Sequence, residues 1–599
     1  MKRNIILLIT TIFLTFGCSE EWLEPDPLSF FAPESALTDK EGMEALIVSI
    51  NKRYRHEYAV TDQNDLLGEW NYSDFSVNGA PPASIPHNLE TQMTPTSTGD
   101  KEVVHYWDRA WAGIKDANII ISRIDEVEFN TEADKNEILS KGYFSRAYWY
   151  YRMVHQFGDV PFIAEEINSP RLDFYSHSRE AILKKITEDL EFAVQWLPID
   201  VEPGDVNRAA GSFLLTKCYL SLREFDKAIS EASKVIDGGK YHLMTERFGS
   251  TEPDFFEFPI LNPDEFDVIW DLHQKYNKSL PENKEAIFVV QDEYLVEGAS
   301  FDGTAGTGNM RDTGPTWWHS AIKDPNGARG TTDKDYDSGL MMIKQLGRGI
   351  GRMVPSQYFR DMRWEDTTDI RYSHNNYFGM ERYLYNNPSS EYYGQPFNAD
   401  FITDMRAWYP FMYNKLFVID DAGSPMPGGG WTDLYVYRLA ELYLLRAEAY
   451  WWKGDIANAT KDVNTVRARA NANPKESVDI DYIFDERARE LYYETPRKTE
   501  LTRVAYIMAQ LGRDGYSLDN MHENNWFYDR VIRRNNFYKD EVLNVSNIYK
   551  MLPYHVYWPI KENVIRANSL GHINQAMGYP GSETNIPPLT DINQQKPAE

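Results

Sequence analysis

The sequence predicts a mainly α-helical protein built from tetratricopeptide-like helical hairpins, with a loop-rich, partly β insertion in its middle. Three observations support this fold class. Apolar residues recur with helical spacing from about residue 36 to 237 and again from 431 onward. Residues 238–430 between these regions are rich in Gly, Pro, Asp and Asn. Two helical hairpins, one on each side of this segment, share a repeat signature.

Six helices are expected in the first helical region, residues 36–237. The second has a clear apolar face that includes Trp107, Trp111 and Ile114. The fourth has Ser178 as its N-cap and Pro198 beyond its end. The expected helices are Ser35 or Ala36 to Tyr54, Val104 to Ile124, Glu137 to Gln156, Ser178 to Trp196, Ala209 to Leu222 and Asp226 to Ile236.

Regular structure is sparse in the middle segment, where Ala286 to Gln291 is the clearest strand. The rest is expected to form long loops, which are uncommon unless they serve a function. Helices return in the C-terminal region, residues 431–599, and a final irregular stretch begins near Asp519. The expected helices there are Leu434–Lys453, Asp455–Ala470 and Ile483–Ala509.

The repeat signature consists of three positions that recur at a constant offset of 231 residues. The first hairpin carries Tyr219, Phe225 and Ala228, and the second carries Tyr450, Ile456 and Ala459. This spacing is typical of a tetratricopeptide repeat, in which the Tyr packs between helices and the Ala lets them approach. The alternative is chance similarity between amphipathic helices. If the repeat is real, the two hairpins are joined by an insertion.

Composition excludes several classes of protein. The 599 residues include 62 Lys and Arg against 91 Asp and Glu, a net charge of −29, which argues against nucleic acid as the main partner. Two cysteines, Cys18 and Cys218, exclude a disulfide framework and an all-cysteine zinc site. Aromatic residues make up 14% of the chain. Most are expected in the core, and a few on a binding surface.

The N-terminus has the pattern of a secretory signal. Lys2 and Arg3 precede an apolar run of about 12 residues, too short to span a bilayer. Gly17-Cys18 then resembles a bacterial lipoprotein cleavage site, although Thr15 stands where Leu is usual. We therefore expect a signal peptide at 1–17, lipidation of Cys18, and a Pro-containing tether at 18–35. The alternative is an ordinary signal peptide with a chance cysteine.

No catalytic motif is present, so no enzymatic activity is expected. The chain lacks a Gly-x-Ser-x-Gly elbow, a His-Glu-x-x-His pair and a phosphate-binding loop. The glycine cluster Gly347–Gly351 is interpreted as a flexible loop, because no evident strand precedes it. Asp333, Asp335 and Asp337 alternate, but Ser338 and Lys344 stand where an EF-hand needs Gly and Glu. A structural Ca²⁺ in another geometry is the only cofactor considered.

Several motifs in order resemble the SusD/RagB family of outer-membrane lipoproteins, over Cys18 to about Tyr579. Thr495-Pro496 departs from the family pattern, where a Gly is usual, and Lys561 stands where a second Pro is common. Each motif is weak alone, and their order and spacing carry the resemblance. The motifs are Tyr106-Trp107…Trp111-Ala112-Gly113-Ile114…Ala117-Asn118, Arg146-Ala147-Tyr148…Phe157-Gly158-Asp159-Val160-Pro161, Arg438-Leu439-Ala440-Glu441-Leu442, Glu486-Arg487…Glu490-Leu491…Glu494…Arg497 and Trp558-Pro559-Ile560.

The resemblance implies a function as well as a fold. Members are cell-surface lipoproteins anchored in the outer membrane, most of which bind glycans and pass them to a SusC-like TonB-dependent transporter. Their fold is a superhelix of repeat-like helical pairs with a looped insertion. Arg146, Glu486 and Arg489 would then lie in buried ion pairs. The alternatives are a peptide-binding RagB-type lipoprotein and, from another class, a surface glycan-active enzyme.

Two loop segments, residues 69–79 and residues 314–319, are expected to bind the glycan, because they combine aromatic faces with hydrogen-bonding side chains. Trp317 and Trp318 are adjacent, so at least one is expected to be exposed if the segment is extended. The alternative is that these aromatics fix long loops to the helical body, in which case Tyr372, Tyr377, Tyr392 and Tyr393 are the next candidates. The expected ligand residues are Trp70, Tyr72, Asp74, Asn78, Trp317, Trp318 and His319.

Overall fold

The computed structural model describes most of the chain. Residues 1–36, which include Cys18 and the expected signal peptide and tether, lie outside the described part. None of the helices within the described ranges is long and apolar enough to cross a membrane. The described residues are 37–59, 66–79, 86–97, 101–250, 252–294, 296, 307–334, 340, 342–398, 400, 405–418, 429–544 and 547–597.

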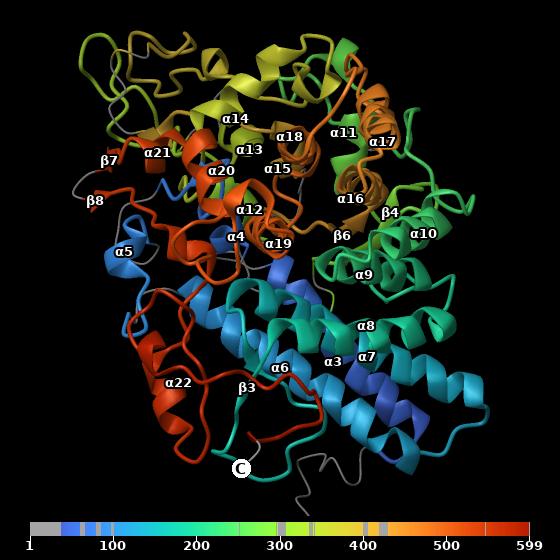
Figure 1. Ribbon diagram of the computed structural model, residues 1–599. Helices are drawn as coiled ribbons and strands as arrows, with labels where there is room; N and C mark the ends of the chain where they lie inside the picture. The colour runs from blue at the N-terminus through green and yellow to red at the C-terminus, as the bar shows by residue number, and fades with distance from the viewer. Residues whose placement is uncertain are drawn as a thin grey trace, which may run out of the picture.

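The first helical region forms the lower half of the molecule in Figure 1, where its long helices lie side by side. Side-chain caps set several helix starts. The Ser178 hydroxyl accepts a hydrogen bond from Ala181 N, as predicted, and Thr131 caps α7, the longest of the described helices, in the same way through Asp134 N. The helices are α3 Lys40–Tyr58, α4 Leu67–Asn71, α5 Leu89–Gln92, α6 Lys101–Arg123, α7 Glu132–Gln156, α8 Arg179–Trp196, α9 Arg208–Ser221 and α10 Phe225–Ile236.

The two hairpins that share the repeat signature pack against each other, although residues 237–438 separate them in sequence. α9 and α10 form the first, and α16 (Leu439–Trp452) and α17 (Ile456–Arg469) form the second. The Arg446 guanidinium crosses between them, since it binds Asp462 of α17 at 2.8 Å and the Ser233 hydroxyl of α10 at 2.9 Å. The helices therefore continue as one tetratricopeptide-like superhelix, with the insertion leaving from its edge.

The middle segment lies at the top of Figure 1 as loops and short elements. Strand β4 (Ala286–Val290) confirms the predicted strand and pairs antiparallel with β6 (Leu434–Arg438), so the two ends of the segment meet. Elsewhere β5 (Val354–Pro355) pairs with β1 (Ser76–Val77). The short helices are α11 Val268–His273, α12 Asn309–Thr313, α13 Met342–Leu346, α14 Gln357–Asp361 and α15 Tyr413–Leu416.

Two of the predicted C-terminal helices were wrong in their extent. The expected helix Leu434–Lys453 begins as strand β6 and becomes helical only at Leu439, because Leu434–Arg438 pairs with β4. The expected helix Ile483–Ala509 is two helices, α18 (Ile480–Leu491) and α19 (Arg497–Gln510). Pro496 lies at the break. Proline has no backbone N–H, so it cannot donate the hydrogen bond that the interior of a helix requires.

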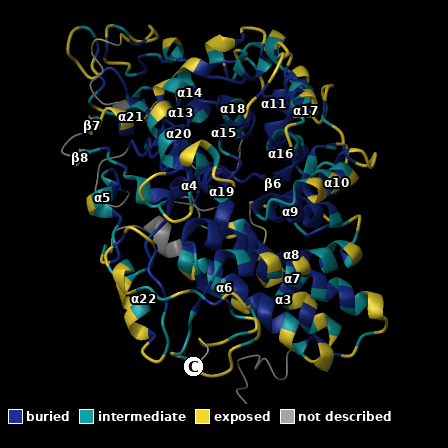
Figure 2. Ribbon diagram, viewed as in Figure 1, coloured by how far each residue is buried: buried dark blue, intermediate teal, exposed yellow. Residues whose placement is uncertain are grey.

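The rest of the C-terminal region covers the left side of Figure 1. The dark core in Figure 2 runs without interruption from the long helices into the loop-rich half. The remaining elements are β2 Val160–Pro161 paired with β3 Ser176–His177, α20 Trp526–Arg534, α21 Asn536–Lys539, β7 Leu543–Asn544 paired with β8 Asn547–Ile548, and α22 Glu562–Ala567.

Buried ion pairs fasten the middle segment to the superhelix. Arg438 of β6 binds Glu285 at 2.8 Å and Glu490 of α18 at 2.6 Å. Arg371 from the middle segment binds Glu486 of α18 at 2.8 Å. Burial alone would raise the pKa of Glu486, but Arg371 and two further arginines outweigh it and lower that pKa to about 2. The Glu486 carboxylate is therefore ionised in the folded protein at neutral pH.

Candidate functional site

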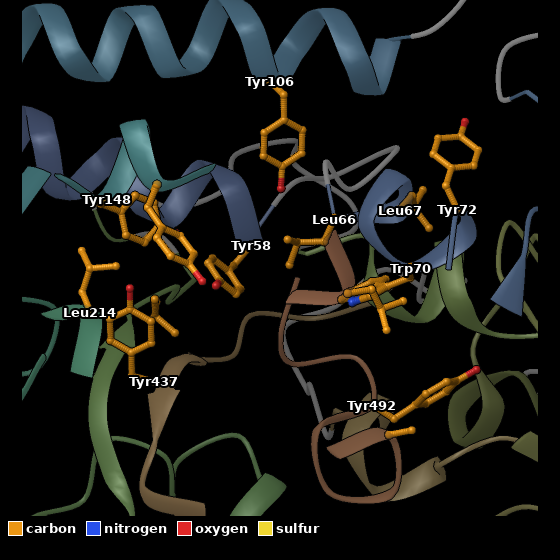
Figure 3. Close-up of a cluster of buried hydrophobic side chains, with 14 of the residues drawn as sticks. Tyr58, Leu66, Leu67, Trp70, Tyr72, Tyr106, Tyr148, Leu214, Tyr437 and Tyr492 are labelled. Atoms are coloured by element: carbon orange, nitrogen blue, oxygen red, sulfur yellow. The ribbon is translucent and has the colours of Figure 1, made fainter. Parts of the chain in front are cut away.

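The first expected ligand segment lies in the core. Trp70 and Tyr72, in and just after α4, are only 2% and 1% exposed. The Trp70 indole N–H donates to Thr495 O at 3.0 Å, and its ring packs among buried apolar side chains (Figure 3). The expectation of exposed stacking faces is therefore wrong for these two residues. Trp70 instead holds α4 against the segment between α18 and α19, through Thr495 and Tyr493.

Asp74 is an ion-pair centre beneath the surface. Its carboxylate accepts hydrogen bonds from Arg497 Nε at 2.8 Å and Arg530 Nε at 2.7 Å, and the residue is 2% exposed. Burial alone would raise the pKa of Asp74, but the two guanidinium groups hold that pKa well below its usual range. Asn78 is also buried, and its backbone carbonyl accepts from the Tyr549 hydroxyl. Neither side chain presents a polar group to solvent in this conformation.

The second expected segment divides between core and surface. Trp317 is fully buried and donates its indole N–H to Gly347 O at 3.0 Å, so the expectation of an exposed face is wrong for it. Trp318 and His319 are half-buried. The segment is a turn, in which His319 N donates to Thr316 O at 3.0 Å, and not the extended strand that was assumed. The expectation of one exposed tryptophan rested on an extended segment, and in this turn Trp318 is half-buried.

Charged and polar groups surround Trp318. The Arg348 guanidinium stacks 3.9 Å from the centre of the Trp318 ring, and Asp333 holds Arg348 at 3.1 Å. The indole N–H donates to Gly349 O at 2.7 Å, which fixes the orientation of the ring. Arg406 Nη2 lies 3.4 Å from His319 Nε2. We call these five residues, Trp318, His319, Asp333, Arg348 and Arg406, the Trp318 face.

The glycine-rich residues 347–352 connect the buried segment, residues 69–79, with the Trp318 face. Asn71 donates to Arg352 O at 2.9 Å on one side, and Trp318 donates to Gly349 O on the other. A Cβ on Gly349 would lie 2.3 Å from Gly314 O, so only glycine permits this close approach of two backbones. The cluster Gly347–Gly351 is therefore a packing requirement, and the flexible loop inferred from sequence is a defined bridge between the two segments.

Comparison with known proteins identifies the family. The family model described as "SusD family" matches residues 284–579, and a second, described as "Starch-binding associating with outer membrane", matches residues 33–220. The chain belongs to the SusD family. It is 24% identical over 530 residues to "SusD-like protein P25" of Formosa agariphila, and the match covers 84% of this chain and 90% of that protein.

Solved structures share the SusD-like fold. A "Laminarin binding SusD-like protein" is 19% identical, with a TM-score of 0.60, and the match covers 90% of this chain and all of that one. "Surface glycan-binding protein A from Bacteroides thetaiotaomicron" is 16% identical, with a TM-score of 0.61 and the same two coverages. These likenesses establish the fold.

The SusD motif residues have structural roles, as predicted. Arg146 binds Asp189 at 2.7 Å, and Arg489 binds Glu486 at 3.0 Å, with all four side chains buried. These buried pairs join neighbouring helices or the turns of one helix. These motif residues therefore hold the helical scaffold together.

A second group of aromatic residues adjoins the Trp318 face. The loop that follows His319 contacts the segment around Tyr392, because Asn326 donates to Glu391 at 2.9 Å and Asn387 N donates to Gly330 O at 3.2 Å. Tyr393 is 37% exposed and Tyr392 is half-buried. Of the other alternative candidates, Tyr377 is buried and Tyr372 half-buried.

The described residues contain no group of three or more His, Cys, Asp or Glu side chains that could hold a metal ion. Asp333 pairs with Arg348, and Asp335 and Asp337 lie outside the described residues. A Ca²⁺ site at this loop therefore stays a prediction. Sequence reasoning missed Arg348 and Arg406, because a surface arginine carries no periodic signal that would connect it with a tryptophan far along the chain.

Proposed function

We propose that this SusD-family protein is a cell-surface lipoprotein that captures oligosaccharide or polysaccharide and delivers it to a SusC-like TonB-dependent transporter. The observation that carries the glycan-binding proposal is the Trp318 face, where a half-exposed indole lies among cationic and anionic side chains. The names of the relatives support it, since two structural neighbours are described as binding laminarin or surface glycans.

The Trp318 face has the chemistry that a sugar needs. Sugar rings present C–H faces that stack on an indole, while their hydroxyls exchange hydrogen bonds with neighbouring polar side chains. Arg348 lies against one face of the Trp318 ring and holds it in place, so the ring need not lose rotamer freedom on binding. Arg406 is a donor and Asp333 is an acceptor for hydroxyls. Binding in this way involves no covalent step, and the protein acts as a non-catalytic receptor.

The membrane role rests on the N-terminal sequence. Lipidation of Cys18 would hold the mature chain on outer-membrane lipid at the cell surface, close to a transporter in the same membrane. Release of the bound glycan into a SusC-like barrel would complete its function. No nucleic acid is expected as a partner, because the net charge is −29.

The test is calorimetric titration of the wild type and two variants against a panel that includes laminarin and starch oligosaccharides. Trp318→Ala should weaken binding at least about five-fold, because loss of one stacking ring costs roughly 1 kcal/mol or more. The thermal unfolding midpoint of Trp318→Ala should change little from that of the wild type. Trp364→Ala is the matched control, since Trp364 is 64% exposed and also stacks on an arginine, with Arg363 at 3.8 Å.

The outcomes separate the candidate functions. Wild-type affinity in Trp318→Ala would remove the Trp318 face as the site. Affinity for peptides and none for glycans would favour the RagB-type alternative. Shortened glycan chains after incubation with the pure protein would show an enzyme and overturn the proposal of a receptor.

A further inference from the structure

An apolar groove lies far from the Trp318 face. Its volume is about 450 Å³, and it lies between one side of α6, residues 161–174 and α22, at the lower left of Figure 1. Its walls are largely apolar, and they are formed by Trp107, Trp111, Ile114, Ile163, Phe174 and Val564, among others.

The lining of the groove exposes more apolar surface than a helix face normally does. Trp107 and Trp111 are half-buried and meet edge to face, with ring centres 5.6 Å apart. On the lip, Ile167 is 36% exposed and Leu172 is 45% exposed. Leu570, whose N–H donates to Leu172 O at 2.8 Å, is 72% exposed. A contiguous apolar patch of this kind marks a surface that another segment covers.

We propose that residues 20–35 of this same chain occupy the groove and hold the N-terminal tether against the body. The position of the first described residues supports this occupant. Asp39 forms a parallel bridge with Glu128, just beyond the end of α6, and Lys40 pairs with Asp134 nearby. Arg53 of α3 binds Asp116 of α6, so α3 runs antiparallel to α6 and the preceding chain emerges at the C-terminal end of α6.

The groove begins at the same end of α6. Arg123 in the last turn of α6 binds Glu166, which lines the groove, at 2.6 Å. The tether must pass from the face of α6 that contacts α3 to the opposite face. A helix is roughly 10–12 Å across, and the groove lines α6 only as far as Asn118, about 8 Å before the helix ends at Arg123. Eight to ten extended residues span about 26–33 Å. The tether is therefore long enough for Leu28 and the residues before it to reach the groove with no change in the helices.

The composition of residues 20–35 matches the groove. Trp22, Leu23, Leu28, Phe30 and Phe31 give five large apolar side chains in a short stretch. Prolines at 25, 27 and 33 favour an extended chain that can lie along a groove. Acidic residues at 20, 21, 24, 26 and 34 accompany them. The groove lining carries charges of both signs, Lys115 and Arg171 against Glu165 and Glu166, so the match rests on the apolar side chains.

The test measures hydrogen exchange in the complete mature chain, made soluble by Cys18→Ser. The reporters are the amides of Leu570 and His572, which donate to Leu172 O and Phe174 O across the groove lip. A variant with Trp22, Leu23 and Leu28 all changed to Ala should exchange at least about ten-fold faster at these amides. Amides of α16 and α17 should not change. Adding a peptide of residues 20–35 to the variant should restore slow exchange, and the same peptide with the three alanines should not.

Equal exchange at the groove in both chains would overturn the proposal. Protection that disappears on dilution of the wild type would also overturn it, because the occupant would then be a second copy of the chain. The result is independent of glycan affinity, so failure of the Trp318 experiment would leave this test unaffected.

Discussion

Asp74 distinguishes a ligand residue from a structural one. Sequence patterns placed it on the glycan surface, whereas the structure places its carboxylate between two buried arginines. Asp74→Asn removes the negative charge and keeps the shape of the side chain. Arg530 would retain Asp481 and Asp485 as partners, whereas Arg497 would lose its carboxylate partner and retain its hydrogen bond to the Phe484 carbonyl at 2.9 Å.

The loss of stability follows from that asymmetry. Removing one partner of a buried ion pair costs about 3–5 kcal/mol, because the other charge stays buried without compensation. Arg530 stays paired and Asn still offers one acceptor oxygen, so we expect a loss of about 3 kcal/mol. Urea unfolding followed by tryptophan fluorescence at pH 7.5 measures it. Glycan affinity of the folded variant should equal that of the wild type.

The control is Asp226→Asn, which breaks an ion pair with Lys453. The Asp226 side chain is 81% exposed, so this substitution should lower the free energy of unfolding by only about 0–1 kcal/mol. The penalty for Asp74→Asn should also shrink in acid. The pKa of Asp74 is lower in the folded than in the unfolded state, so its contribution is present above about pH 4 and is lost as pH falls toward the folded pKa. A stability change below about 1 kcal/mol with a large loss of affinity would refute the structural role.

Three further predictions concern other parts of the molecule. Burial lowers the pKa of Lys498 to about 7. Between about pH 7 and pH 10 only the unfolded state binds this proton, so the free energy of unfolding should rise with pH over that range. Urea midpoints measured at both ends of the range should show this rise in the wild type and a flatter dependence in Lys498→Met. Cys18→Ala should release the protein from membranes, and absence of labelled palmitate from the wild type would contradict the anchor. Gentle detergent extraction should recover a large barrel protein together with this one, and recovery of the lipoprotein alone would count against a transporter complex.

Helix periodicity predicted most of the superhelix, because a buried face repeats along the sequence. Ser178 as N-cap and Ile236 as the end of α10 were found where the pattern placed them. The pattern failed at Leu434–Arg438, since a short apolar run fits a buried strand as well as a helix and only its distant partner β4 decides between them. Pro496 indicates the break between α18 and α19, but the prediction of one continuous helix followed the apolar periodicity and not the proline.

Exposure of single aromatic residues could not be predicted in the same way. Trp70 and Trp318 both lie in segments that combine aromatic and polar residues, yet one is 2% exposed and the other half-buried. The difference arises from contacts with Thr495 and Gly349, which lie far away in the sequence. The alternation argument for Trp317 and Trp318 assumed an extended segment, and the segment is a turn, so the different burial of these two neighbours has another cause.

The contact between α10 and α16 has a consequence for biosynthesis. Residues 237–438 must be made before the two hairpins can meet, and closing a loop of this length costs about 2–3 kcal/mol more than closing one of ten residues. At about 5–20 residues per second, α10 is complete roughly 10–40 s before α16. During this interval the side of α10 that carries Phe225 and Ser233 has no partner helix, because Phe225 stacks on Trp452 and Ser233 binds Arg446, both of which belong to α16. That side of α10 is therefore a surface for chaperones to bind while the nascent chain awaits its second half.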